Sequence, residues 1–171
     1  MQLKLHIMKN SIIFFLLVCF ITNTYSQIDS NIISKNEFYG TTLNGLSIDK
    51  LMKSDGNLNT LKNYFGEPSE SNINEKIGLK AYVFRGLRVN FREGLSGFTV
   101  LNNEVIINLK GKSFKIGSHI NALGHNIIFN TTSSGDKTII LQFCEGCNDY
   151  ILIDFDQQTK LIKEVRYVIL T

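Results

Sequence analysis

The sequence predicts an α+β protein in which an antiparallel sheet carries short helices packed on one face. Two short segments near the N-terminal end place apolar residues at helical spacing. Through most of the remaining chain, apolar and polar residues alternate, and turns containing Gly or Asn separate the alternating runs. Removing the first 26 of the 171 residues leaves 145, which is the size of one domain.

The first 26 residues have the order of a secretory signal. Lys4 and Lys9 precede the unbroken apolar run 12–21, and a polar segment with small residues ends at Ser26. We therefore expect this segment to be removed, with cleavage between Ser26 and Gln27.

We expect no stable membrane anchor after cleavage. The apolar run is shorter than the roughly 20 residues that a bilayer-spanning helix needs. Val18 stands before Cys19, where lipid attachment to a cysteine requires a small residue. The sequence thus predicts an exported protein, periplasmic or extracellular, whose remaining cysteines meet an oxidising compartment.

Charge argues against a nucleic-acid partner. Without the signal, which holds two lysines and no acids, 16 basic residues face 15 acidic ones and the formal net charge falls from +3 to +1. Nucleic-acid binding favours a concentrated basic face, which a near-neutral chain does not predict.

Residues 27–42 are expected to form a loose leader segment or a short edge strand, ahead of a single α+β domain over 43–171. Within that domain, Ser47 is a candidate N-cap for a helix over Ile48–Lys53. Asn57 is a candidate cap for a second helix, which Gly66 ends and Pro68 prevents from resuming. The apolar residues of this second helix are Leu58, Leu61 and Phe65.

Period-two alternation predicts the strands. The first expected meander has strands at 81–84, 87–92, 98–101 and 105–109, and the second follows a short helix at 119–123 with strands at 126–130, 138–143, 150–155 and 164–170. In the strand 87–92, Leu87, Val89 and Phe91 point to one face, and Arg88, Asn90 and Arg92 point to the other.

The helix-then-meander order recurs, which predicts two tandem halves at about 43–110 and 111–171. Leu87-x-Val89-x-Phe91 matches Ile151-x-Ile153-x-Phe155, and Leu95-x-x-Phe98-x-Val100 matches Ile162-x-x-Val165-x-Tyr167. The alternative is that any two amphipathic hairpins look alike.

The end of the helix pair carries a resemblance. The run Leu61-x-x-Tyr64-Phe65-Gly66-Glu67-Pro68, followed by Tyr82-Val83-Phe84 and a meander, resembles the fold shared by β-lactamase-inhibitor proteins and small outer-membrane lipoproteins of the SmpA/OmlA type. The resemblance covers roughly residues 43–109. It implies a helix layer on an antiparallel sheet, in an exported, non-enzymatic protein that binds other proteins. The chain lacks the lipid-acceptor cysteine of the lipoprotein branch.

Cys144 and Cys147 are the only cysteines left after cleavage, and they predict one disulfide across a hairpin loop of Glu145-Gly146. Residues that flank such a loop lie about 5.5 Å apart at Cα, which suits a disulfide. The alternative is a thiol-redox or metal-binding protein centred on this pair. Redox pairs normally lie at a helix N-terminus, and zinc would require His119 and His125 to meet both cysteines.

Catalytic motifs do not stand out. The sequence has no Gly-x-Ser-x-Gly elbow, phosphate loop or dinucleotide fingerprint, and Asp154 and Asp156, expected on one strand face, suit solvated acids. We therefore expect a non-catalytic binding module with no cofactor and no metal, for an unknown protein partner or envelope component.

We expect Arg88, Asn90 and Arg92, on the outer face of the sheet, to be the binding residues. In the repeat alignment this face is basic in the first half and acidic in the second. A bipolar face could orient a protein partner, because charge sets specificity and encounter rate. The alternative is ordinary solubility with cross-strand ion pairs.

Overall fold

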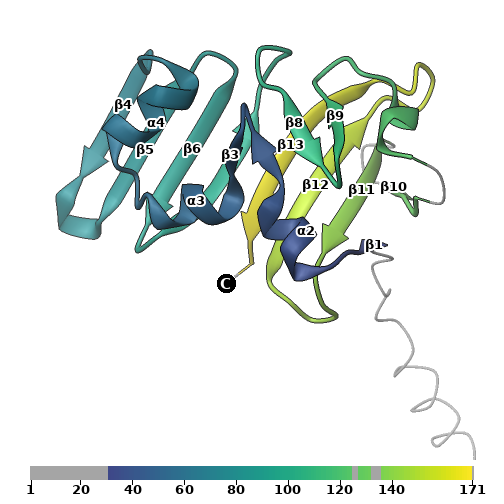
Figure 1. The fold of residues 1–171 in the computed structure, drawn as a ribbon, viewed down its shortest axis with the longest axis horizontal. Coiled ribbons are helices and arrows are strands. Elements are labelled where there is room, and N and C mark those ends of the chain that lie inside the picture. Colours follow the sequence, from purple (N-terminus) through teal and green to yellow (C-terminus); the bar gives the residue numbers. More distant parts are fainter. Residues whose placement is uncertain (1–30, 125–126, 132–135, 171) are drawn as a thin grey trace, which may run out of the picture.

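The computed structural model describes residues 31–124, 127–131 and 136–170 (Figure 1). The expected signal, its cleavage point at Ser26 and Gln27, and His125 lie outside these residues. Within the described residues the fold is α+β and mostly strands, with one nine-stranded sheet, one four-stranded sheet and a few short helices. None of the described helices is long and apolar enough to cross a membrane.

The large sheet has the strand order β1-β11-β12-β13-β7-β6-β5-β4, with β10 beside β11. Strand β1 runs parallel to β11, and the other strand pairs of the described residues are antiparallel. The bounds are β1 (Asn31–Ile32), β4 (Glu70–Asn74), β5 (Leu79–Phe84), β6 (Leu87–Arg92), β7 (Leu95–Val100), β10 (Asn130–Thr131), β11 (Lys137–Gln142), β12 (Asp149–Phe155) and β13 (Ile162–Ile169).

The small sheet has the order β3-β2-β8-β9. Its strands are β2 (Thr42–Leu43), β3 (Leu46–Ser47), β8 (Ile107–Leu109) and β9 (Lys112–Phe114). The helices are α2 (Lys35–Gly40), α3 (Ile48–Lys53) and α4 (Leu58–Phe65), with 3₁₀ turns η1 (Glu75–Ile77) and η2 (Ile120–Leu123).

Two helices form where the sequence predicts them. The Ser47 side chain accepts a hydrogen bond from the backbone at the start of α3, and the Asn57 side chain does the same for α4. Helix α4 ends at Gly66, which has a φ of 76°. These caps satisfy backbone N–H groups that a helix leaves unpaired at its first turn, so both predictions are confirmed.

Helix α2 lies within the expected leader segment and was not predicted. Ser34 and Glu37 form a capping box, in which each side chain accepts a hydrogen bond from the other residue's backbone N–H. Phe38 is fully buried, and its ring lies 6.2 Å from that of Tyr167 on β13. The described part of the expected leader segment therefore contributes to the core.

The helices and the small sheet lie across one face of the large sheet (Figure 1). Phe65 of α4 packs 5.5 Å from Phe84 of β5, and the Tyr82 hydroxyl donates a hydrogen bond to the Gly56 carbonyl before α4. At the other end, the Tyr39 hydroxyl donates to Asp149 of β12. Burial raises the pKa of Tyr39, and hydrogen bonding to Asp149 raises it further, so this hydroxyl stays protonated at neutral pH.

The alternation in β6 is confirmed, because Leu87, Val89 and Phe91 are buried. The expected fourth strand of the first meander is wrong: residues 107–109 form β8 in the small sheet. The strand that pairs with β7 at this position is β13, in which Val165 lies opposite Val100. The matched segments of the proposed repeat lie in β6, β12, β7 and β13, and the tandem repeat stays a prediction.

Candidate functional site

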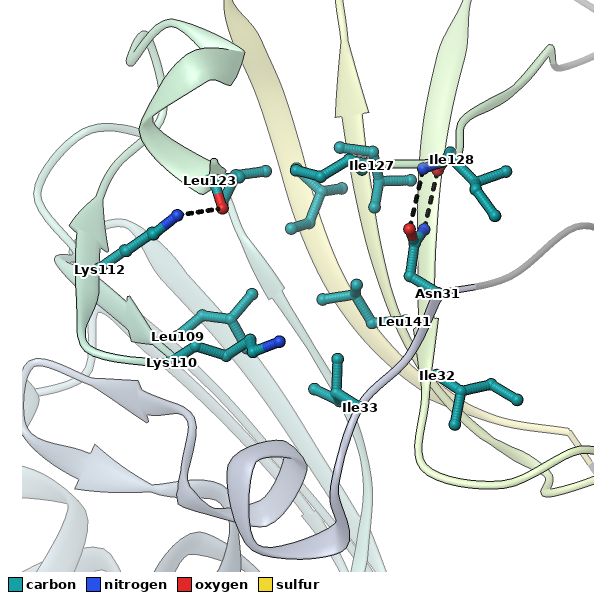
Figure 2. A pocket seen from close by; sticks show the side chains of 12 residues that line it. Asn31, Ile32, Ile33, Leu109, Lys110, Lys112, Leu123, Ile127, Ile128 and Leu141 are labelled. Carbon is teal, nitrogen blue, oxygen red and sulfur yellow. Dashed lines mark hydrogen bonds between the residues drawn. The ribbon is translucent and has the colours of Figure 1, made fainter. Parts of the chain in front are cut away.

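A cavity of about 450 Å³ lies between the two sheets (Figure 2). The large sheet contributes aliphatic side chains of β11 and β12, and the small sheet contributes Leu109 with its neighbours at the β8–β9 turn. Residues 31–33, together with Leu123, Ile127 and Ile128, supply the remaining described lining. The lining residues from the sheets are Ile139, Leu141, Ile153, Leu109, Lys110 and Lys112.

Asn31 lines the cavity and forms two hydrogen bonds with the backbone of Ile128. Its Nδ2 donates to the Ile128 carbonyl at 2.8 Å, and the Ile128 N–H donates to its Oδ1 at 2.9 Å (Figure 2). Nδ2 also donates to the Ile140 carbonyl at 3.2 Å. The side-chain amide of Asn31 therefore connects the start of the described chain to segment 127–128 and to β11.

Two lysines stand at the small-sheet side of the cavity. Lys110 Nζ lies 3.7 Å from Glu37 Oε1, and both side chains are exposed. The backbone hydrogen bond from Ser34 lowers the pKa of Glu37, and Lys110 lowers it further, so Glu37 is ionised at neutral pH. Lys112 Nζ donates to the Leu123 carbonyl at 3.1 Å. None of the described lining residues is acidic.

Gly124 makes the position of Lys112 possible. A Cβ on Gly124 would lie 2.1 Å from Lys112 Nζ, and the residue has a φ of 110°. The positive φ favours glycine at this position, and a larger residue would also displace the flexible tip of Lys112. The ammonium group is thereby held beside the Leu123 carbonyl (Figure 2).

A second cavity of about 270 Å³ adjoins the first. Ile127 and Ile139 line both cavities, and Phe129 and Phe155 line the second. The shared residues make one continuous apolar wall on this side of the molecule. No local pattern in the sequence predicts this wall, because its members come from segments far apart in the chain.

The predicted binding residues lie on the other face of the large sheet. Arg88 and Asn90, with Glu70 and Ser71, line a shallow hollow of about 310 Å³ on that face. Arg92 is exposed on the same strand. The structure places these side chains as the alternation predicts, and a binding role for them stays a prediction.

The acidic half of the expected bipolar face is different. Asp154 pairs with Arg166 across β12 and β13 and accepts a hydrogen bond from Thr138. Asp156 lies beyond the end of β12, so the two acids do not share a strand face. Hydrogen bonds, first from the Thr159 backbone and then from Lys163, lower the pKa of Asp156 to about 2. Asp154 is therefore paired across the strands and Asp156 is paired within a turn.

The structure joins Cys144 and Cys147 in a disulfide with a Cα–Cα distance of 5.5 Å. The pair lies in the loop between β11 and β12, where the Cys147 N–H donates to the Cys144 carbonyl. His119 caps η2 by accepting a hydrogen bond from Asn121. Among the described residues no cluster of three or more His, Cys, Asp or Glu side chains could hold a metal.

We expect the double substitution Cys144→Ser/Cys147→Ser to lower the free energy of unfolding by only about 1–2 kcal/mol, because the bond closes a loop of four residues. Urea unfolding of the wild-type and variant proteins measures this. Titration of the wild type with dithiothreitol is the companion measurement. A bond that reduces as readily as that of a thiol oxidoreductase would support the thiol-redox alternative instead.

No protein-family sequence model matches the chain, and no curated protein matches it. Similar solved structures include an extracellular protein containing an SCP domain from Bacillus anthracis, at 13% identity and a TM-score of 0.41, covering 85% of this chain and 49% of that one. Another is a cysteine-rich secretory protein from Staphylococcus aureus, at 18% identity and a TM-score of 0.34, covering 66% and 43%. The chain thus spans less than half the length of either structure.

These similarities correct the predicted resemblance to β-lactamase-inhibitor proteins and SmpA/OmlA lipoproteins, which is wrong. The resemblance depended on Gly66-x-Pro68 after an amphipathic helix. Glycine after the last helical residue, with proline beyond it, ends helices in many unrelated folds. The motif therefore predicts the end of α4 and does not identify a family.

Proposed function

We propose that the protein is exported and acts as a non-catalytic binding module, which takes a small amphipathic component of the cell envelope into the cavity between its sheets. The observation that carries this proposal is the aliphatic cavity of about 450 Å³ with lysines on one side. Ligand sites of known proteins have volumes of roughly 300–1,000 Å³, with mostly apolar walls and a few placed polar groups.

The construction of the cavity supports binding. Leu141 and Ile153 lie on paired central strands and are almost fully buried, so their side chains form a fixed wall. Export is supported by the basic, apolar and small-residue order of the first 26 residues. The apolar wall favours a ligand with an apolar part, and export favours a ligand from the cell envelope.

A neutral, apolar fluorophore such as N-phenyl-1-naphthylamine tests the cavity, using the mature chain. We expect saturable binding with increased fluorescence. Leu141→Phe should fill part of the cavity and so exclude part of the fluorophore. We expect binding to weaken about tenfold or more, which corresponds to a loss of roughly 1.4 kcal/mol in binding free energy. Leu123→Phe, at a half-buried lining position, should act in the same direction.

Ile140→Phe is the matched control, because Ile140 is the neighbour of Leu141 on β11 and faces away from the cavity. It should leave the affinity for the fluorophore unchanged. Circular dichroism melting establishes that each variant is folded. Equal weakening by the Ile140 and Leu141 variants, or no saturable binding by the wild type, would refute the proposed site.

A further inference from the structure

We propose that Lys110 and Lys112 make this cavity selective for single-chain amphiphiles with an anionic head group, either a carboxylate or a phosphate. The alkyl chain lies against the aliphatic wall of β11 and β12, and the head group lies at the lysines of the β8–β9 hairpin. This inference rests on the proposed function and adds to it the chemistry of the ligand.

The charges at the cavity are incompletely neutralised. Lys112 donates to a carbonyl, which is uncharged. Lys110 has Glu37 at 3.7 Å, a contact that is longer than a charge-assisted hydrogen bond and lies between exposed side chains. An anionic head group in the cavity would be attracted by both ammonium groups, whereas a neutral or cationic head group would not.

The β8–β9 turn has a lysine at a position where asparagine is the preferred residue. Lys110 and Gly111 both have positive φ, at 53° and 74°, as a tight type I′ hairpin turn requires. The small sheet's other hairpin fills the same two positions with Asn44 and Gly45, the preferred pair. Lysine is less favoured than asparagine in this left-handed region, so replacing Lys110 by Asn should not destabilise the turn.

The β8–β9 turn places Lys110 at the cavity. In Figure 2 the Lys110 side chain lies beside Leu109 and extends toward Ile33, within the cavity lining. Lys112 reaches Leu123 on the same side, in the space that the missing side chain of Gly124 leaves open. Both cations therefore stand on one side of the cavity, with the aliphatic wall opposite.

Displacement of the neutral fluorophore tests the selectivity. The competitors are decanoate, decyl phosphate, decanol and decyltrimethylammonium, each with a ten-carbon chain, the carboxyl carbon of decanoate included, and all below their micelle concentrations. We expect the better of the two anions to bind about tenfold or more tightly than decanol, and the preference to shrink as salt is raised. The comparison of decanoate with decyl phosphate distinguishes the two head groups.

Lys110→Asn removes the positive charge and keeps a residue that suits the turn. Asparagine suits a type I′ turn, so the variant should melt at the same temperature as the wild type or higher. It should nevertheless lose about fivefold or more of the affinity for the preferred anion and none of the affinity for decanol. Lys112→Met should act in the same direction. Lys115→Asn, on an exposed lysine beyond β9, is the control and should change neither affinity.

The outcomes distinguish this inference from the proposed function. If the fluorophore binds but decanoate, decyl phosphate and decanol compete equally, the anionic selectivity is overturned and the cavity site remains. The same conclusion follows if the double variant Lys110→Asn/Lys112→Met keeps the full preference for anions. If the fluorophore does not bind at all, the proposed function itself fails.

Discussion

Replacing Phe38 by Ala should lower the free energy of unfolding by about 3–5 kcal/mol, the usual cost of removing a buried phenylalanine ring. The side chain is fully buried, with its ring 5.2 Å from that of Phe143 and 6.2 Å from that of Tyr167. Its removal leaves a cavity where α2 meets the large sheet. Urea unfolding of the mature chain, followed by circular dichroism, measures the loss.

Phe129→Ala is the matched control, because Phe129 is 52% exposed, although its ring lies 5.8 Å from that of the buried Phe155. Its loss should be about 1 kcal/mol or less. If the two variants lose the same stability, or if removing residues 27–40 leaves stability unchanged, α2 is not part of the folded core.

Gly97→Ala should cost about 2–3 kcal/mol, because an added methyl group overpacks the centre of the large sheet. Gly97 lies opposite Val168, at the pairing of β7 with β13. A Cβ at this position would be 2.8 Å from the Tyr167 carbonyl oxygen, and that atom belongs to the backbone and cannot turn aside. The melting temperature and the hydrogen exchange of β7 and β13 amides measure the effect.

Gly40→Ala provides the comparison, since a Cβ at Gly40 meets nothing within 4 Å. Gly40 is the last residue of α2, where alanine also restricts the unfolded chain more than glycine does. We expect a change between zero and a gain of about 1 kcal/mol. A Gly97 variant as stable as the Gly40 variant would contradict the close approach of β7 to β13.

Local signals account for the elements that the sequence predicts. The caps at Ser47 and Asn57 act within one helical turn, and the alternation in 87–92 reports burial on one side of a strand. The missed elements lack such signals. Strand β4 is exposed along its whole length, so no alternation marks it, and the two-residue strands of the small sheet are too short to show a period.

Helix α2 is the exception, because its signal was present. Ser34 and Glu37 have the spacing of a capping box, and Phe38 comes directly after them. The wrong placement of strand β8 has a different cause. The position beside β7 is occupied by β13, which comes from the far end of the chain, so β8 pairs with β2 instead. Alternation gives the faces of a strand but not its neighbours.

The sequence located the outer-face residues but not the cavity. The orientation of Arg88 and Asn90 follows from the period of one strand. The cavity requires Asn31, Lys110 and Leu141 to meet, and these come from three distant segments. Lys110-Gly111 was the one local sign, because lysine is an unusual first residue for a tight hairpin turn.

The parallel pairing of β1 with β11 has a consequence for the order of assembly. Asn31 bonds to the Ile140 carbonyl, 109 positions later in the chain. This end of the molecule therefore stays open until two segments far apart in the chain have come together. A contact between such distant positions forms slowly, because the intervening chain must first be confined. The pairing of β1 with β11 is therefore expected among the last steps of folding.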